Sequence, residues 1–472
     1  MKENRRIIHV LIVVCLLFFS LIGYLTYFEI FKKSTVITSS YNRRQWEREE
    51  SVLRGSILDR NSVLLAKSTK VKGKQKRVYP YKDLYSHVIG YNSRAYGRTL
   101  LESAYNGYLL DISQLSSVFG MKSKPSDKES LGNNIYLSID HKLQSLASRR
   151  LQGRKGSVVA MNPKTGEILA MVSYPSFDTN ENKLSENWQE LVESQESPFL
   201  PRAVRGMYTA GSTFKIVISA AAVENGLEDK VYNDKGTVLI DGKPFKNSGG
   251  KAYGDIDMVK ALSVSSNVYF SQMGVELGED KIKDISRRFG FGEAIPFDIT
   301  TAKSRFSYDN MGKTDMAAVG IGQGKVLVSP LHMAMIVSCI ANDGVMMKPY
   351  LVTRIESSQG KKIKSFEPSV FKNVISRKTA SKVQDAMWEV VKNGTGKSAA
   401  IGGINVAGKT GTAENELTVK EENKEHNWFV GFAPVENPQI AVAVILEYHG
   451  STGGKACAPI ARDLMREWLK NK

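Results

Sequence analysis

The longest uninterrupted apolar stretch of the chain lies near its amino terminus. Residues 7–28 read IIHVLIVVCLLFFSLIGYLTYF and contain no Asp, Glu, Lys or Arg. About 20 such residues are enough for a helix to cross the hydrocarbon core of a bilayer. We therefore predict a membrane anchor over residues 7–29, preceded by a cytoplasmic tail of residues 1–6. A cleaved signal peptide is the alternative, but its apolar region is shorter and ends at a small-residue cleavage site, whereas Glu29 and Lys32 follow this run.

Paired apolar runs near both ends of the remaining chain predict buried strands. Residues 157–173 (SVVAMNPKTGEILAMVS) hold two such runs around an Asn-Pro-Lys-Thr-Gly turn, which is typical of a hairpin. Residues 429–433 and 440–447 form a second pair, separated by the sequence PVENP. Helical patterns lie between the two pairs. We therefore predict an α+β domain, with layers of helix and sheet, from about residue 155 to residue 472.

Residues 30 to about 130 differ from the rest, because short apolar runs alternate there with polar clusters. Residues 67–77 (KSTKVKGKQKR) place six basic residues in eleven, which favours a solvated hairpin or loop over an anion-binding patch. Residues 121–130 (MKSKPSDKES) have the composition of a linker. We expect a separate amino-terminal domain over residues 30–150, called the pedestal below.

An apolar segment that begins at Ser212 predicts a buried helix containing one lysine. Residues 211–215 (GSTFK) lead into IVISAAAVENGL, where Gly226 provides a stop signal. A helix that is apolar on all sides is buried, and a buried ammonium group is costly unless it is paired or loses its proton. Side chains three residues apart share a helix face, so the Lys215 amine can reach the Ser212 hydroxyl. This arrangement predicts a nucleophilic serine activated by a lysine near the positive end of a helix dipole. A buried ion pair of Lys215, or a side chain that snorkels to solvent, is the alternative.

Ser-x-x-Lys alone is a weak signal. It also occurs at Ser248, Ser358 and Ser369, where the polar surroundings predict solvated loops. Two further motifs follow Ser212 in apolar contexts, namely Ser265-Ser266-Asn267 and Lys409-Thr410-Gly411-Thr412, and their first residues lie 53 and then 144 residues further along the chain. Each short motif recurs by chance, but the three together in this order form a specific set.

Composition narrows the functional classes. Of 472 residues, 42% are hydrophobic, which allows a large core and excludes a disordered or collagen-like protein. The three Cys exclude a disulfide scaffold and a Cys-rich zinc module, and no His lies in an HExxH arrangement, so we predict no metal site. The net charge of +17 suits an anionic surface, but we find no nucleic-acid-binding motif. Basic residues flank the apolar run of residues 7–28 on both sides, so charge alone does not orient it.

The ordered set Ser-x-x-Lys, Ser-x-Asn and Lys-Thr-Gly resembles that of the penicillin-binding proteins and serine β-lactamases. Five further segments resemble the class B penicillin-binding proteins in particular: residues 54–61 (RGSILDRN), 174–180 (YPSFDTN), 322–324 (GQG), 329–330 (SP) and 341–344 (ANDG). The resemblance covers nearly the whole chain. Two positions depart from the family pattern, Ala210 in place of the usual Pro and Ser62 in place of the usual Gly, and both concern local backbone geometry.

The resemblance implies a fold and a setting. The fold would be α+β, with an antiparallel sheet of about five strands covered by helices on both faces, preceded by an extended mixed pedestal and one transmembrane helix. The transpeptidase domain would span residues 151–472. The bulk of this single-pass membrane protein would be extracytoplasmic. The implied partners are peptidoglycan stem peptides, β-lactam antibiotics, membrane lipid, a SEDS-type glycan polymerase and other membrane proteins of wall synthesis, with no nucleic acid.

The resemblance also implies a role for each motif residue in peptidoglycan D,D-transpeptidation. Ser212 would attack the penultimate D-Ala carbonyl of a stem peptide, and Lys215 would take its proton. Ser265 would pass a proton to the leaving amine, and Asn267 would orient Lys215 and the peptide amide. The substrate would pair with an edge strand that carries the remaining site residues, Lys409, Thr410, Gly411 and Thr412. The N–H groups of Ser212 and Thr412 would form an oxyanion hole, and no metal or organic cofactor would be required.

Other activities would use the same residues. A D,D-carboxypeptidase uses water where a transpeptidase uses an amine, and the residues leave both open. A β-lactamase or β-lactam sensor would need rapid deacylation or an inward signal, and we find no support for either in the sequence. A catalytically silent scaffold of the wall-synthesis machinery would have altered motifs, whereas these three motifs are intact.

Overall fold

The computed structural model describes residues 2–28, 51–71, 73–112, 130–414 and 425–470. Helix α1 (Lys2–Tyr27) contains most of the predicted anchor. Within it, Ile7–Tyr27 has a mean hydropathy of 2.7 over an 18-residue window, of which no part is buried against other described residues. By length and composition this helix can therefore cross a membrane. The linker predicted over residues 121–130 lies outside the described residues, apart from Ser130.

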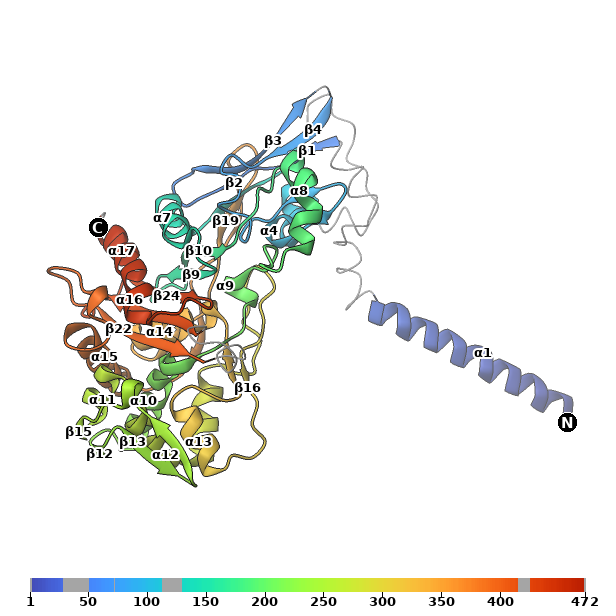
Figure 1. Ribbon diagram of the computed structural model, residues 1–472. Coiled ribbons are helices and arrows are strands. Elements are labelled where there is room, and N and C mark those ends of the chain that lie inside the picture. Colours follow the sequence, from blue (N-terminus) through green and yellow to red (C-terminus); the bar gives the residue numbers. More distant parts are fainter. Residues whose placement is uncertain (1, 29–50, 72, 113–129, 415–424, 471–472) are drawn as a thin grey trace.

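A five-stranded antiparallel sheet, in the order β10-β9-β24-β23-β22, forms the centre of the carboxy-terminal domain (Figure 1). Its strands are β9 (Gly156–Met161), β10 (Ile168–Tyr174), β22 (Ala407–Ala413), β23 (His426–Ala433) and β24 (Ile440–Leu446). The two hairpins predicted from apolar runs are thus confirmed as β9–β10 and β23–β24. Within the described part of the chain, β22 pairs with β23 alone, so it is an edge strand.

Helices cover both faces of this sheet. Successive side chains of a strand point to opposite faces, so each strand contributes to two cores. On one face, Val158 and Ala160 of β9 pack in a core with α7 (His141–Leu151) and α17 (Ala458–Leu469). On the other face, Val159 and Met161 pack in a core with α14 (Pro330–Ala341). The predicted sheet with helices on both faces is therefore confirmed.

A second group of helices places α10 (Lys215–Glu224) next to the edge of the sheet. Helix α10 packs between α12 (Asn267–Arg288) and α15 (Arg377–Lys392), and α15 also packs on β22. The same group includes α11 (Met258–Val264) and α13 (Lys313–Gly320). Every residue of α10 from Lys215 to Val223 is buried, as the all-apolar pattern predicted.

The pedestal contributes to a six-stranded sheet in the order β20-β19-β8-β2-β3-β4. Strands β19 (Val352–Glu356) and β20 (Lys362–Ser365) come from far along the chain. Strand β19 pairs with β8 (Asn134–Leu137) on one side and with β20 on the other. This sheet joins strands from both sides of the boundary predicted at residue 150, and the division into domains remains a prediction. The basic segment of residues 67–77 forms the hairpin of β3 (Leu64–Val71) and β4 (Lys74–Val78), with exposed lysines, as expected for a solvated hairpin.

Apart from α8, a helix of 13 residues, the remaining elements are short. They are β1 (Val52–Leu53), β2 (Ile57–Leu58), β5 (Asn92–Ser93), β6 (Gly97–Arg98), α4 (Leu100–Ala104), α5 (Asn106–Leu109), β7 (Ser130–Leu131), α8 (Glu181–Glu193), α9 (Arg202–Arg205), β11 (Tyr208–Thr209), η2 (Gly211–Phe214), β12 (Tyr232–Asp234), β13 (Thr237–Ile240), β14 (Lys243–Lys246), η3 (Ser248–Gly250), β15 (Gly254–Ile256), β16 (Arg305–Phe306), β17 (Val326–Val328), β18 (Val345–Met347), β21 (Val370–Asn373), η4 (Lys397–Ala399) and α16 (Gly453–Ala456).

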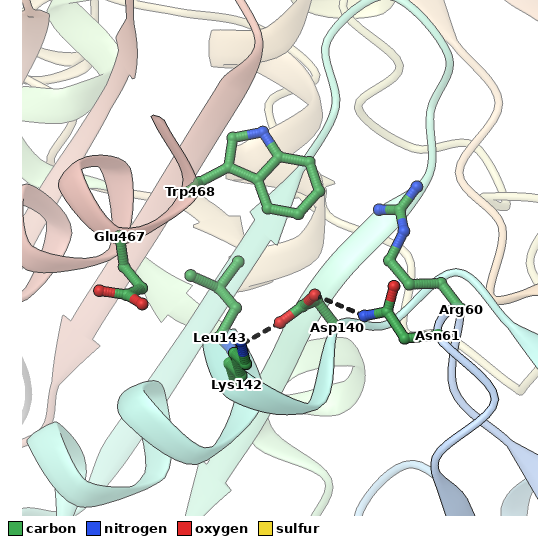
Figure 2. A pocket seen from close by; sticks show the side chains of 7 residues that line it. All are labelled: Arg60, Asn61, Asp140, Lys142, Leu143, Glu467 and Trp468. Atoms are coloured by element: carbon green, nitrogen blue, oxygen red, sulfur yellow. Dashed lines mark hydrogen bonds between the residues drawn. The ribbon is translucent and has the colours of Figure 1, made fainter. Parts of the chain in front are cut away.

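The segment that resembles a class B signature, residues 54–61, joins the pedestal to the carboxy-terminal domain. The buried carboxylate of Asp59 accepts hydrogen bonds from the backbone N–H groups of Asn61 (2.8 Å), Val63 (2.7 Å) and His141 (3.1 Å). Asp140, the residue before α7, accepts hydrogen bonds from the Asn61 side chain and from Leu143 N (Figure 2). These residues line a cavity of about 240 Å³, together with Arg60 and Trp468. The contacts of Asp59 and Asn61 therefore connect residues 54–61 to the start of α7, the helix that packs on the five-stranded sheet.

The same segment begins with a buried ion cluster in the pedestal. Arg54 and Arg77 both contact the fully buried carboxylate of Glu102, each through Nε at 2.7 Å, and the Tyr79 hydroxyl donates to it at 3.1 Å. Burial alone would raise the pKa of Glu102, but the charges and hydrogen bonds of the two arginines hold this pKa at about 2.

Replacing Glu102 with Gln is expected to destabilise the protein by about 3–5 kcal/mol, because two buried guanidinium groups lose their counter-charge. The pKa of Glu102 falls from 4.5 to about 2 on folding, so its contribution is complete above about pH 5 and is lost as the pH falls toward 2. Urea-induced unfolding of the purified chain at several pH values measures both effects. The control is Glu186→Gln, which removes an exposed ion pair with Lys183 and is expected to cost less than about 1 kcal/mol. Equal losses in the two variants would contradict the prediction.

Candidate active site

Ser212 lies in a single 3₁₀ turn, η2, directly before α10, and is half-buried. The sequence predicted a helix opening at this serine, and the helical turn is present but tighter than an α-helix. Gly211 has a φ of 53°, and a Cβ atom there would lie 2.8 Å from the Cβ of Ala413 on β22. Only a glycine therefore lets the Ser212 turn lie this close to the edge strand.

Two buried lysines meet at the Ser265 hydroxyl. Lys409 Nζ donates to Ser265 Oγ at 2.8 Å, and Lys215 Nζ lies 3.4 Å from the same oxygen. Lys215 Nζ also donates to Asn267 Oδ1 at 2.7 Å and to the Ser265 carbonyl at 2.9 Å. The structure thus brings together four of the five predicted catalytic residues through direct contacts. Among the described residues, no hydrogen bond joins Ser212 Oγ to Lys215 Nζ.

Local structure explains how these side chains converge. Ser265 ends α11 with a φ of 60°, a left-handed conformation that is uncommon outside glycine. Ser266 caps α12 by accepting a hydrogen bond from Tyr269 N at 2.9 Å, so that Asn267 is the first helical residue. The reversal between two helices therefore presents Ser265 and Asn267 to Lys215.

The surroundings favour a neutral amine on Lys215. Burial, assisted by the positive charge of Lys409, lowers the pKa of Lys215 well below 10.5, whereas the carboxylate of Asp234 opposes this effect. Burial also lowers the pKa of Lys409, to about 7. The positive charge of Lys409 acts on Lys215 in addition to desolvation, whereas desolvation is the cause of the shift at Lys409. Lys215 is thus suited to accept a proton, and Lys409 to face an anion.

The other predicted site residues lie along β22. Lys409 Nζ donates to the carbonyl of Thr410 at 2.8 Å, and the Thr410 hydroxyl shares a hydrogen bond of 2.7 Å with Thr395. Gly411 lies against Thr213, and the side chain of Thr412 is exposed on this edge strand. An edge strand with free backbone groups can accept an extended peptide as an added strand.

Sequence reasoning missed three polar residues that support the site: Asp234, Asn247 and Thr395. All three lie in polar, glycine-containing segments, and no local pattern distinguishes them. The other Ser-x-x-Lys serines, Ser248, Ser358 and Ser369, are exposed, as their polar surroundings predicted.

Comparison with known proteins gives matches over both folded parts of the chain. Residues 156–466 match the penicillin binding protein transpeptidase domain, and residues 54–135 match the penicillin binding protein A dimerisation domain. The peptidoglycan D,D-transpeptidase PbpA of Mycolicibacterium smegmatis is 32% identical over 97% of this chain and 98% of its own length. The peptidoglycan D,D-transpeptidase MrdA of Acinetobacter baumannii is 30% identical over 85% of this chain and 67% of its own length.

Solved structures agree with these matches. The D,D-transpeptidase domain of a peptidoglycan glycosyltransferase from Eggerthella lenta superposes with a TM-score of 0.78 at 34% identity, covering 89% of this chain and 99% of that one. Penicillin-binding protein A from M. tuberculosis, in its penicillin G acyl-enzyme complex, superposes with a TM-score of 0.81 at 30% identity, covering 89% of this chain and 100% of that one. The resemblance inferred from the motifs is therefore confirmed, and the chain belongs to the class B penicillin-binding proteins of the transpeptidase family.

Proposed function

We propose that this protein is a serine-type D,D-transpeptidase that cross-links peptidoglycan stem peptides through an acyl-enzyme on Ser212, and that β-lactams acylate the same serine. The observation that carries this proposal is the pair of buried lysines that share the Ser265 hydroxyl beside the Ser212 turn. Relatives named D,D-transpeptidases and a β-lactam acyl-enzyme of similar structure support it.

In the acylation step, Ser212 Oγ attacks the carbonyl carbon of the penultimate D-Ala, and neutral Lys215 takes the Ser212 proton. The backbone N–H groups of Ser212 and Thr412 stabilise the negative charge that develops on the carbonyl oxygen. The peptide C–N bond then breaks, Ser265 gives its proton to the leaving amine, and Lys409 replaces that proton from 2.8 Å. Lys215 then passes the Ser212 proton through Ser265, whose Oγ lies 3.4 Å from Lys215 Nζ, to Lys409, so that Lys215 is neutral again before the second step. Terminal D-Ala departs, and an ester on Ser212 remains.

In the second step, an amine of a neighbouring stem peptide attacks the ester carbonyl. The new C–N bond forms as the Ser212 C–O bond breaks, and the proton released by the amine returns to Ser212 through Lys215. Asn267 holds Lys215 in place during both steps through its contact with Nζ. Lys409, Thr410 and Thr412 bind the substrate carboxylate, and the backbone of β22, including Gly411, pairs with the extended stem peptide.

We further propose that α1 anchors the protein in the cytoplasmic membrane with its body on the outer side. Peptidoglycan is assembled outside this membrane, and long domains are translocated largely regardless of flanking charge. A transpeptidase needs nascent glycan strands, so a SEDS-type polymerase in the same membrane is the proposed partner. Residues 30–150 would then form the pedestal between anchor and catalytic domain, and residues 151–472 the transpeptidase domain.

A labelled penicillin is expected to form a long-lived adduct on Ser212 of the full chain, because the site can form the ester but offers an attacking amine only from a stem peptide. Proteolysis and mass spectrometry locate the adduct. Ser212→Ala is expected to abolish it, whereas Ser248→Ala, at an exposed Ser-x-x-Lys serine, is expected to leave it unchanged. An adduct on another residue would contradict the site assignment, and its hydrolysis within seconds would favour a β-lactamase. Stem-peptide dimers from a pentapeptide substrate would distinguish cross-linking from carboxypeptidase activity.

A further inference from the structure

A buried carboxylate and amide, Asp234 and Asn247, lie directly under the turn formed by Ser265, Ser266 and Asn267. The exposed fractions of Asp234 and Asn247 are 1% and 5%. Asn247 Nδ2 donates to both oxygens of Asp234, at 2.8 and 2.9 Å, and to the carbonyl of Lys251 at 2.8 Å. Asp234 Oδ1 also accepts from Gly236 N at 2.8 Å. These contacts hold the pair rigidly beside α12.

The pair supplies the partners that the start of α12 lacks. The first N–H groups of a helix have no acceptor within it. Asn247 Oδ1 accepts from two of them, Asn267 N at 2.7 Å and Val268 N at 3.1 Å. Asp234 Oδ2 accepts from the fully buried Ser266 hydroxyl at 2.6 Å. Both residues of the pair therefore contact the middle or the end of the turn.

The same segment orients the Asn267 side chain. Asn267 Nδ2 donates to the carbonyl of Lys246, the neighbour of Asn247, at 2.8 Å. This bond directs the amide oxygen, rather than the amide nitrogen, toward Lys215 Nζ at 2.7 Å. Movement of Asn247 would displace the backbone and the side chain of Asn267 together. It would also displace Ser265, whose backbone is in the left-handed conformation.

Charge adds a second effect of Asp234. Among the described residues, the charged groups that act on Lys215 are Lys409 on β22 and Asp234 at the end of β12. Ser265 and Asn267, its other polar contacts, are neutral. Asp234 is therefore the acidic group that balances Lys409, and it raises the pKa of Lys215 while Lys409 lowers it.

We propose that Asp234 and Asn247 are positioning residues for the acylation of Ser212. They fix the Ser265–Asn267 turn against the two lysines, and the Asp234 carboxylate supplies the negative charge that balances Lys409. This inference rests on the function proposed above and extends it to residues outside the three motifs.

Asp234→Asn is the first test. An amide has one acceptor oxygen, whereas the Asp234 carboxylate accepts from Asn247, Ser266 and Gly236, so at least one donor loses its partner. Acylation of the full chain in detergent, measured as the second-order rate with a fluorescent penicillin, is expected to slow by about 10²-fold. Acylation requires neutral Lys215, and loss of the carboxylate lowers the pKa of Lys215. The acid limb of the pH–rate profile is therefore expected to move to lower pH.

Two neutral changes separate positioning from charge. Ser266→Ala and Asn247→Ala each remove contacts to the turn without changing a charge, so both are expected to slow acylation while the acid limb stays in place. Ser266→Ala deletes a single hydroxyl group. If Asp234→Asn does not fold, the acylation rate of Ser266→Ala still tests the positioning role. The matched control is Asp59→Asn, which alters a buried carboxylate with three N–H donors at the pedestal junction and is expected to change neither rate nor limb.

The outcomes are distinct. The positioning role would be overturned if folded Asp234→Asn and Ser266→Ala were acylated at the rate of the unmodified protein. It would also be overturned if they were slowed only as much as Asp59→Asn. A slowed Asp234→Asn with an unmoved acid limb would overturn the charge effect. No adduct on Ser212 in the unmodified protein would instead overturn the proposed function itself.

Discussion

Replacement of Lys215 with arginine is expected to slow acylation of Ser212 by about 10²–10⁴-fold, the range that a general base contributes. Arginine is also a basic residue with a long side chain, but its guanidinium group does not lose its proton near neutral pH. Lys215 is fully buried, and its pKa lies well below 10.5 because of that burial and the charge of Lys409. The proposed mechanism needs this neutral amine, so a permanent cation at the same position removes the base.

The rate is measured with a fluorescent penicillin under conditions in which the enzyme acylates once. Lys215→Met removes the base without adding volume or charge, and it is expected to be slowed to a similar extent, so a poor fit of arginine cannot account for the result. The control is Lys246→Arg, because the Lys246 side chain is exposed and only its carbonyl contacts Asn267. Acylation of Lys215→Arg at the rate of the unmodified protein would contradict a lysine base.

Local patterns were sufficient to predict much of the fold. The apolar run in α1, the hairpins β9–β10 and β23–β24, and the buried helix α10 each follow from residues close in sequence. The site residues were recognisable because Ser212, Ser265 and Lys409 begin three motifs in a fixed order. The structure explains why the three motifs occur together, since Lys215 and Lys409 converge on one Ser265 hydroxyl.

Long-range pairing could not be predicted in the same way. Strand β19 joins β8 across more than 200 residues, and no local pattern specifies that register. Asp234 and Asn247 are polar residues in loop-like segments, so their burial depends on tertiary packing against α12. Backbone conformation could not be predicted from the sequence either. Ser62, at a position where the family usually has glycine, has a φ of 65°, a conformation that glycine adopts more easily.

Lys409→Gln is expected to slow acylation at neutral pH by about 10²–10³-fold, comparable to the loss of a charge-stabilising group in an active site. Two effects combine. In the proposed mechanism, the change removes the ammonium group that binds the substrate carboxylate and also the donor, 2.8 Å from Ser265 Oγ, that restores the Ser265 proton. Removal of the positive charge also raises the pKa of Lys215 toward 10.5, because Lys409 lowers it in the unmodified protein.

The pH–rate profile separates these effects. Acylation falls as the pH drops through the pKa of Lys215, so a raised pKa moves the acid limb of Lys409→Gln to higher pH, opposite in direction to Asp234→Asn. Lys409→Arg keeps the charge and is expected to leave the limb near its original position even where the rate is reduced. Lys455→Gln removes an exposed charge from α16, which packs on β22, and is expected to change neither rate nor limb. An acid limb that does not move in Lys409→Gln would show that the charge of Lys409 does not set the protonation of Lys215, and the two lysines would then act independently.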